Sequence, residues 1–331
     1  MLWIEKYRPK EFGEILGQDP AIRLLSSCAK NHTLPHLILS GPHGTGKSAA
    51  VECFARTLYG DNWELNTSRF PTADLFSQGK AFLEQDDRYA HLYQKNQSLI
   101  NNFKYIIKWY ASLRPLDTEF KLMVFEDAHT LTLDAQQVLR RIMERSSGTC
   151  RFIFTTTNQS SIIPAIASRC LPLFFAPVDQ NVMQQFLRTI KEKEPNDKHS
   201  CSDDDLELIV QAARGDMRRA ILLLQVAFET GKCHSLFEID QSETANVSES
   251  AIKAIKEGDI RGAVRRLESL MIDYGLSGSE VLEQIRTITR REYNHPALAI
   301  ALADAELCMR HSNNEFVQIG AFATTVHTVF S

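Results

Sequence analysis

The stretch Gly41-Pro42-His43-Gly44-Thr45-Gly46-Lys47-Ser48 decides the fold of this chain. It has the spacing G-x-x-x-x-G-K-S of a phosphate-binding loop. Residues 37–40 before it are apolar and β-rich, and residues 49–58 after it favour a helix. Glycines let the backbone aim successive N–H groups at phosphate oxygens, and the helix start adds its positive dipole end. This context disfavours the alternative, a chance glycine-rich turn.

The last two residues of the loop indicate which ligand it holds. In loops of this spacing the lysine reaches the β- and γ-phosphates, and the hydroxyl of the next residue ligates Mg²⁺. We therefore predict that the loop binds ATP and Mg²⁺, with Lys47 on the phosphates and Ser48 on the metal.

Two acidic residues, Glu126 and Asp127, follow an apolar run at residues 122–125 that is typical of a buried strand. Ligands bind at the carboxyl ends of strands in open α/β sheets, so these acids are candidates for holding Mg²⁺ and orienting water. A third strand at 151–157 ends at Asn158, which is placed to meet the γ-phosphate or the attacking water. The alternative for Asn158 is an ordinary turn former at a strand end.

Composition places the chain among globular proteins without naming a partner. Its 331 residues are 44% apolar and 24% charged, and the formal net charge is −4. The seven cysteines show no C-x-x-C spacing, which argues against a zinc ribbon or a disulfide framework and favours a reducing compartment. We find no signal-peptide pattern, and no apolar run approaches the length of a membrane helix. We therefore expect a cytoplasmic protein, or a nuclear one in a eukaryote, without a membrane partner.

The pattern of elements predicts an α/β domain followed by helices. Residues 1–176 alternate strands and helices around a parallel sheet. Within them, the polar stretch 66–101 shows no strand pattern, and we predict a surface insertion that contains short helices. Residues 177–233 predict a small all-α domain, and residues 234–331 a second all-α domain.

Five stretches are distinctive in combination: residues 3–9 with Phe12, Ile15, Gly17 and Gln18; the phosphate loop; residues 134–144; Ser168-Arg169-Cys170; and residues 215–220. Together they resemble the small subunits of replication factor C, the AAA+ sliding-clamp loader, over nearly the whole chain. The opening and the Ser-Arg-Cys segment are specific to that family. The resemblance implies a divergent, archaeal-type second small subunit.

The resemblance implies roles for individual residues. The opening segment would fold over the adenine, with Tyr7, Arg8 and Pro9 nearby. Asn158 would be the polar sensor, and Arg169 the arginine finger that acts in trans on ATP of the neighbouring subunit. Arg218 would be the second sensor on a lid helix. An arginine at a helix start opposes the helix dipole, which favours a bound anion over a merely exposed side chain.

The resemblance also implies contact with DNA phosphates. Lys104 and Lys108 occupy a matching position on the helix predicted over 103–113, and they share one helix face because they lie four residues apart. A solvated helix face is the alternative. Contacts of this kind would be sequence-independent and salt-sensitive.

The chain departs from the family pattern at its acids. The family has D-E-A-D, whereas this chain has Glu126-Asp127-Ala128-His129. Glu126 is one methylene longer than the usual metal ligand, and Asp127 is one methylene shorter than the usual water-orienting residue. A reach error of about 1 Å costs roughly 10²-fold in rate. We therefore expect ATP binding to survive and hydrolysis by this subunit to be weak.

These features predict an ATPase subunit of a hetero-oligomeric clamp loader, expected to be a pentamer. With its partner subunits it would load a sliding clamp onto primer–template DNA during replication. A non-hydrolysing structural subunit is the first alternative, favoured by the exchanged acids. An AAA+ ATPase of another DNA-repair or checkpoint assembly is the second, and the collar-length helical tail disfavours a branch-migration motor.

Overall fold

The computed structural model describes residues 2–330 except 117, 195–200, 232–242, 275, 293–295 and 313. Contacts divide the chain into two compact units, Met1–Gly231 and Lys232–Ser331. The predicted boundary after residue 233 lies outside the described residues. The predicted boundary after residue 176 lies inside the first unit and stays a prediction.

A five-stranded parallel sheet with the order β2-β3-β4-β1-β5 forms the centre of the first unit. The strands are β1 (His36–Ser40), β2 (Thr67–Pro71), β3 (Lys121–Glu126), β4 (Cys150–Thr156) and β5 (Cys170–Phe174). The three predicted strands correspond to β1, β3 and β4, and the parallel α/β fold is confirmed. Because the strands are parallel, their carboxyl ends share one edge of the sheet.

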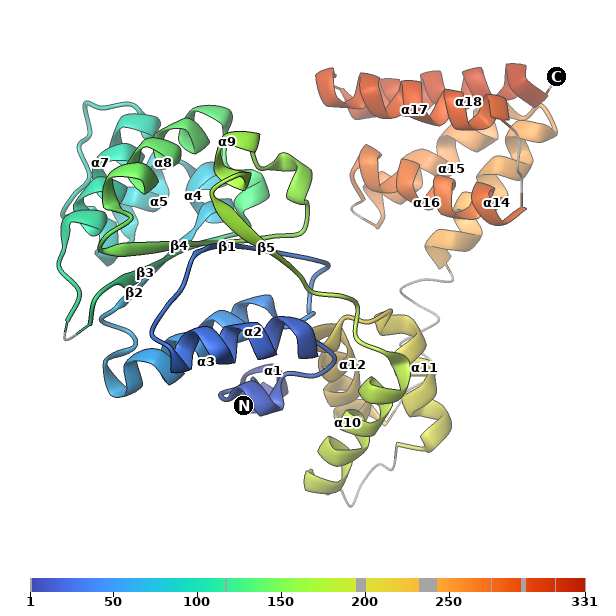
Figure 1. Cartoon of the computed structure of the whole chain (residues 1–331). Helices are drawn as coiled ribbons and strands as arrows, with labels where there is room; N and C mark the ends of the chain where they lie inside the picture. Colours follow the sequence, from blue (N-terminus) through green and yellow to red (C-terminus); the bar gives the residue numbers. More distant parts are fainter. Residues whose placement is uncertain are drawn as a thin grey trace. The chain divides into compact units, whose positions relative to one another are not determined.

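Helices cover both faces of this sheet (Figure 1). On one face lie α2 (Asp19–Lys30) and α3 (Lys47–Tyr59), whose Leu25 and Phe54 share a buried cluster with Leu39 of β1. On the other lie α7 (Leu99–Ser112) and α8 (Leu133–Ser146). Shorter helices are α1 (Trp3–Lys6), α4 (Thr72–Gln78), α5 (Lys80–Gln85), α6 (Asp87–Ala90) and α9 (Pro164–Ala167), with 3₁₀ turns at Phe12–Glu14, Gly60–Asn62, Ala128–Thr130 and Gln159–Ser161.

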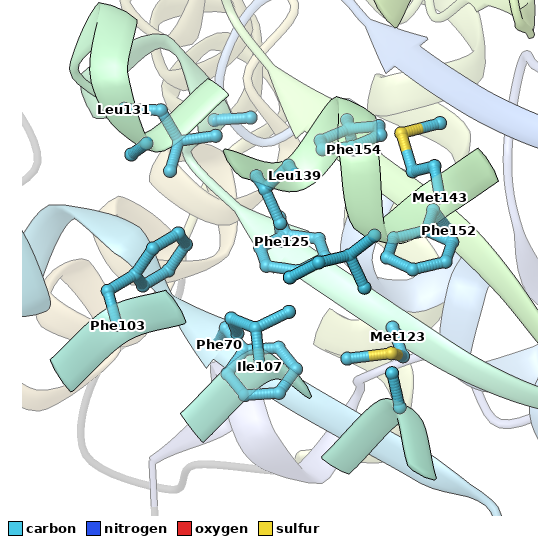
Figure 2. Packing of buried hydrophobic residues seen from close by; sticks show 14 of the residues in the cluster. Phe70, Phe103, Ile107, Met123, Phe125, Leu131, Leu139, Met143, Phe152 and Phe154 are labelled. Atoms are coloured by element: carbon cyan, nitrogen blue, oxygen red, sulfur yellow. The ribbon is translucent and has the colours of Figure 1, made fainter. Parts of the chain in front are cut away.

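A row of phenylalanines fixes the register of three strands on the face that α7 and α8 cover (Figure 2). Phe70, Phe125 and Phe154 are direct neighbours across β2, β3 and β4. The ring of Phe125 stacks on Phe70 at 5.0 Å and on Phe154 at 5.3 Å between centroids. Cross-strand aromatic pairs of this kind each contribute roughly 0.2–1 kcal/mol. The row fixes the position of Glu126, the last residue of β3, and of Asp127 directly after it.

The prediction that 66–101 is a surface insertion without a strand is wrong. Its first residues form β2, an edge strand parallel to β3. Phe70, Leu75, Leu83 and Tyr89 are buried in the main core, so the segment completes the sheet and its cover. The predicted short helices are confirmed as α4, α5 and α6. The sequence did not predict this strand, because its polar residues and Pro71 interrupt any apolar pattern. An edge strand tolerates such residues.

The opposite edge strand, β5, also lacked a sequence signal. It contains Pro172 and pairs with β1 on one side only. Within sheets, proline is largely confined to edge strands, because it has no N–H to donate to a neighbouring strand and an edge strand has a neighbour on one side only. Pro172 therefore lies in the last strand of the sheet, before the chain leaves it.

Three helices complete the first unit, and we call them the lid helices: α10 (Gln180–Lys193), α11 (Asp203–Ala213) and α12 (Met217–Thr230). Side-chain caps explain their starts. Asp179 caps α10, Ser202 forms a capping box with Asp205 on α11, and Asp216 caps α12. An N-cap of this type contributes typically ~1 kcal/mol.

All the described secondary-structure elements of the second unit are helices. Its helices are α14 (Glu243–Lys256), α15 (Ile260–Ile272), α16 (Gly278–Glu292), α17 (Pro296–His311) and α18 (Glu315–Phe330). They share a separate apolar core that includes Ile255, Leu267, Ile285, Leu302 and Phe322. Within the described part of the chain, no helix is both long and apolar enough to cross a membrane.

Candidate functional site

A cavity of about 510 Å³ lies at the carboxyl ends of the central strands. This volume is in the range of small-molecule sites. It is lined by residues of the N-terminal stretch 4–16, the phosphate loop with the start of α3, the end of β3 and the start of α12. Arg69, Thr155, Val178 and Phe186 complete the lining. The cavity therefore combines segments that lie far apart in the sequence.

Two glycines of the phosphate loop are required by their surroundings. Gly41 has φ 146°, and a Cβ there would overlap the carbonyl oxygen of Phe175. Gly44 has φ 65°, and a Cβ there would overlap the carboxylate of Asp216. Both backbone conformations favour glycine, so the turn depends on these residues for space as well as for conformation.

The loop delivers the N-terminus of α3 to the cavity. Gly46 is the N-cap with φ 96°, and no side chain caps the helix. The first N–H groups of a helix have no partner within it, and they carry the positive end of its dipole. Residues 43–49 line the cavity, so this helix start forms an anion site.

Lys47 brings a cation to the same place. Its ammonium donates to the carbonyl oxygens of Gly41 at 2.6 Å and Pro42 at 2.5 Å. The pKa of Lys47 is lowered to about 8, mainly by burial and also by Arg218, while Asp127 and Asp216 oppose the shift. At neutral pH the side chain is therefore mostly charged, but more easily deprotonated than a surface lysine.

The acid that ends β3 and the acid that follows it both face this cavity. Glu126 and Asp127 line it together with Ser48. Thr72 at the start of α4 donates its hydroxyl hydrogen to the backbone carbonyl of Glu126 at 2.6 Å or of Asp127 at 2.9 Å. Asp127 has φ 52°, a left-handed conformation. The turn that carries the acids is thus held by the segment 66–101.

The residues present fit the predicted Mg²⁺. The Ser48 hydroxyl and the carboxylate of Glu126 belong to one cavity, and both supply the hard oxygen atoms that Mg²⁺ prefers. Mg²⁺ takes one or two protein ligands beside phosphate oxygens and keeps several waters. Two protein oxygen ligands next to a phosphate site match that demand.

The predicted adenine segment and second sensor also meet here. Tyr7, Arg8 and Pro9 line the cavity from the N-terminal side, and Arg218 lines it from the start of α12. The structure therefore brings these residues together with residues 43–48 and the two acids. Residues 41 and 42 do not line the cavity, but their carbonyl groups accept hydrogen bonds from Lys47, which does.

Asn158 and Arg169 do not line the cavity. The amide oxygen of Asn158 accepts hydrogen bonds from the backbone N–H of Ser160 at 3.1 Å and its hydroxyl at 2.6 Å. Thr155 is the residue of β4 that reaches the cavity. Arg169 is half-exposed and pairs with Glu144 of α8 at 2.6 Å. Arg169 thus lies outside this subunit's own site. A residue that acts in trans is expected to lie outside the site of its own subunit.

Lys104 and Lys108 are both exposed on α7, away from the cavity. The opposite side of the helix carries the buried residues Phe103, Ile106 and Ile107, which pack into the core. The two lysines therefore share one solvent-facing side of the helix, as their spacing predicts.

Sequence reasoning missed Arg69 and Glu52. Arg69 of β2 lines the cavity, and its guanidinium pairs with Glu52 of α3 at 3.2 Å. Arg8 and Arg56 bind the same carboxylate, at 3.0 and 2.9 Å. Burial raises the pKa of Glu52, but the three guanidinium groups outweigh it and the net pKa is lowered. No local sequence pattern predicts this cluster of Glu52 and three arginines, because its members come from separate segments of the chain.

Comparisons with known proteins show the family of this chain. The family described as "DNA polymerase III, delta subunit" matches residues 17–179. The replication factor C small subunit of Picrophilus torridus is 34% identical over 340 residues, covering 100% of this chain and 98% of that protein. That of Archaeoglobus fulgidus is 30% identical, covering 99% and 98%. The chain belongs to the replication factor C small-subunit family.

Solved structures with a similar fold support the AAA+ architecture. The Aeropyrum pernix ORC1 protein in complex with DNA superposes with a TM-score of 0.56 at 18% identity, covering 93% of this chain and 86% of that one. A single-residue variant of Thermotoga maritima RuvB gives 0.52 at 18% identity, covering 84% and 88%. At this identity the likeness concerns the fold alone. Family membership comes from the closer sequence relatives.

Proposed function

We propose that this chain is the ATP-binding small subunit of a clamp loader, which places a sliding clamp on primer–template DNA. One observation carries the proposal. In a member of the replication factor C small-subunit family, the phosphate loop, the acids Glu126 and Asp127, and Arg218 line one cavity. That combination supports nucleotide binding with hydrolysis over binding of a neutral ligand.

The chain's own residues would divide the work as follows. The N–H groups at the start of α3 and the ammonium of Lys47 would hold the phosphates, and Arg218 would contact the γ-phosphate from the lid. Residues 7–9 would enclose the adenine. Ser48 and Glu126 would hold Mg²⁺, which neutralises charge on the phosphate oxygens. Asp127 would orient the attacking water.

Arg169 would serve the neighbouring subunit. Its guanidinium lies outside its own cavity and is bound by exposed groups, Glu144 and the carbonyl of Ala165. Exposed ion pairs are worth about 0–1 kcal/mol, so Arg169 can leave Glu144 at little cost. Ring assembly would then place it on ATP of the next subunit, in a hetero-oligomer that we expect to be a pentamer.

Lys104 and Lys108 would contact the DNA backbone, and the second unit would serve as the oligomerisation collar. Both lysines are exposed on one side of α7. Contacts from such side chains to phosphates do not depend on the base sequence. A second candidate function is a subunit that binds ATP without hydrolysing it. The exchanged acids favour that candidate, since Asp127 is short for its role.

Equilibrium binding of a fluorescent ATP analogue tests the proposal. Lys47→Ala removes the cation from the phosphates and should weaken binding at least about tenfold, as expected for a lost charged hydrogen bond. Lys80→Ala, an exposed lysine of α5, is the control and should leave affinity unchanged. Equal affinity of the Lys47→Ala variant and the unchanged chain would remove the basis for the ATP assignment.

A further inference from the structure

The N-terminal residues 3–9, which we call the strap, contact two parts of the first unit at once. At one end the backbone N–H of Trp3 donates to the side-chain oxygen of Gln225 on α12 at 2.8 Å. The Trp3 indole packs edge-on against Phe228 of the same helix, with 5.2 Å between ring centroids. The strap is therefore docked on the lid by a hydrogen bond and an aromatic contact.

The middle of the strap contacts a second lid helix. The hydroxyl of Tyr7 donates to the carboxylate of Glu194 at 2.6 Å, and the ammonium of Lys6 pairs with the same carboxylate. Glu194 is the C-cap residue of α10. Burial and the bond to Glu194 raise the pKa of Tyr7 to about 12, so its hydroxyl remains a donor through the physiological range.

The other end of the strap is fixed to α3, the helix that follows the phosphate loop. Arg8 pairs with Glu52 at 3.0 Å, and the thiol of Cys53 donates to the carbonyl oxygen of Pro9 at 3.7 Å. The stretch thus runs from the lid helices to the helix that carries the anion site. Between these ends, residues 4, 5 and 7 line the cavity.

Helix α12 is arranged so that the strap acts at one end and the cavity lies at the other. Arg218, Ile221, Gln225 and Phe228 follow one another at steps of three, four and three residues, which is one helix face. Arg218 and Ile221 line the cavity, whereas Gln225 and Phe228 hold the strap. A helix is stiff over this length, so fixing its second half fixes where Arg218 lies.

We propose that Trp3 and Gln225 are positioning residues of the nucleotide site: by docking the strap on α12 they set Arg218 against the phosphates. Neither residue lines the cavity. The inference rests on the proposed ATP binding and identifies the contact that positions the lid helices for ATP. Bound ATP would contact both the strap and Arg218. Loss of the contact between the strap and α12 would let Arg218 move away from the phosphates, and ATP affinity would fall although neither Trp3 nor Gln225 touches ATP.

Affinity for ATP, measured by calorimetry on the full chain, tests this device. Trp3→Ala should weaken binding about fivefold to tenfold, the size expected for an edge-to-face aromatic contact. Trp3→Phe retains a ring and the backbone N–H, and should restore affinity to within about twofold. Val226→Ala is the matched control on α12, because Val226 is exposed, neighbours Gln225 and has no part in the cavity or the strap contacts.

A double-variant cycle separates positioning from general loss of stability. If the strap acts through Arg218, Trp3→Ala should weaken binding no further in an Arg218→Ala background. Two effects that add in full, or a Trp3→Ala variant that binds like the unchanged chain, would overturn the proposal. Should Trp3→Ala fail to fold, Gln225→Leu, which removes the acceptor of the Trp3 N–H, carries the same expectation. An unchanged chain that does not bind ATP would overturn the proposed function itself, a separate result.

Discussion

At residue 127 the backbone gives a physical reason for the exchanged acids. Asp127 has φ 52°, and left-handed conformations favour Asp and Asn over longer side chains. Glu126 directly before it ends the regular strand β3. An aspartate at 127 therefore suits the turn, while the longer Glu126 extends into the cavity from a normal strand conformation. Local backbone preference and reach toward ATP favour different residues at position 127.

The first prediction concerns these two acids. The double change Glu126→Asp with Asp127→Glu keeps the net charge and rebuilds the order found in the family. It should raise hydrolysis at this site, by up to roughly 10²-fold if reach limits the rate. The measurement uses assembled complexes whose other sites carry inactivated phosphate loops.

The control for this experiment is each single change, which alters the length of one acid only. A natural subunit that already hydrolyses as fast as the rebuilt one would make the exchange neutral. It would then also remove the support for a subunit that holds ATP without turning it over.

Lys47 supplies a pH-dependent prediction at the same scale. Its pKa in the free protein is about 8, and phosphate oxygens beside it would raise that value in the complex. Proton uptake should therefore accompany ATP binding above pH 8, and affinity should fall by up to about tenfold per pH unit there. Calorimetry in two buffers of different ionisation enthalpy measures the uptake.

Lys47→Arg is the informative control, because a guanidinium stays charged throughout this range. Its ATP affinity should be lower than that of the unchanged chain near neutral pH, but it should not vary with pH above that point. An affinity of the unchanged chain that is equally flat above neutral pH would contradict the lowered pKa as a factor in binding.

At the scale of elements, the start of α12 lies directly on the phosphate loop. The backbone N–H of Met217 donates to the carbonyl oxygen of Gly44 at 3.2 Å, and Asp216 packs over the Gly44 Cα. The same Asp216 caps α12. The lid helices are thus joined to the loop at its glycine, in addition to their contacts with the N-terminal residues.

This joint makes Gly44→Ala a test of how the two elements fit. The new methyl group would overlap the Asp216 carboxylate and should move the start of α12 away from the loop. We expect ATP affinity to fall at least about tenfold, since a shift of about 1 Å can cost that much in a well-fitted site. Equilibrium binding of an ATP analogue measures the loss.

Gly60→Ala is a matched control for this variant. Gly60 also has a positive φ, 56°, but a Cβ there meets nothing within 4 Å. It should cost stability through backbone strain and leave ATP affinity unchanged. Equal loss of affinity in both variants would mean that strain alone, and not the contact with Asp216, is responsible.

At the scale of the whole molecule, the proposed function makes this chain's site half of an arrangement shared with a neighbouring subunit. Its own cavity holds the phosphate loop, both acids and Arg218, whereas Arg169 lies outside and pairs with Glu144. Glu144 belongs to α8, which follows the acids in the chain. This arrangement supports the proposal that the subunit binds its own ATP and offers Arg169 to a neighbour.

Arg169→Ala should therefore show its defect only after assembly. The variant subunit should bind ATP with unchanged affinity, because Arg169 does not line its cavity. Hydrolysis at the neighbouring site should fall about 10³-fold or more, the usual worth of an arginine supplied in trans. Turnover is measured in complexes in which only that neighbouring site is active.

Arg140→Ala is a close control, since Arg140 is a second, half-exposed arginine that pairs with Glu144, at 3.4 Å. It should leave both affinity and turnover unchanged. A defect of Arg169→Ala in the isolated subunit, with normal hydrolysis by the assembly, would argue for a structural role instead.

The sequence by itself determined the features that depend on neighbours along the chain. The spacing from Gly41 to Ser48, an apolar run before it and a helix after it were enough for β1, the loop and α3. The apolar runs before Glu126 and Asn158 were enough for β3 and β4. These signals are local, because turns, strand burial and helix starts are set within a few residues.

Tertiary structure decided the rest. β2 is a strand because it pairs with β3, and its polar sequence alone did not show it. Partners more than a hundred residues apart, such as Trp3 with Gln225, cannot be read from spacing. The sequence placed Asn158 correctly at the end of β4. Its side-chain amide, however, is hydrogen-bonded to Ser160, and Thr155 is the residue of β4 that reaches the cavity. Which side chain faces a site depends on the packing of whole elements, and no short pattern contains that information.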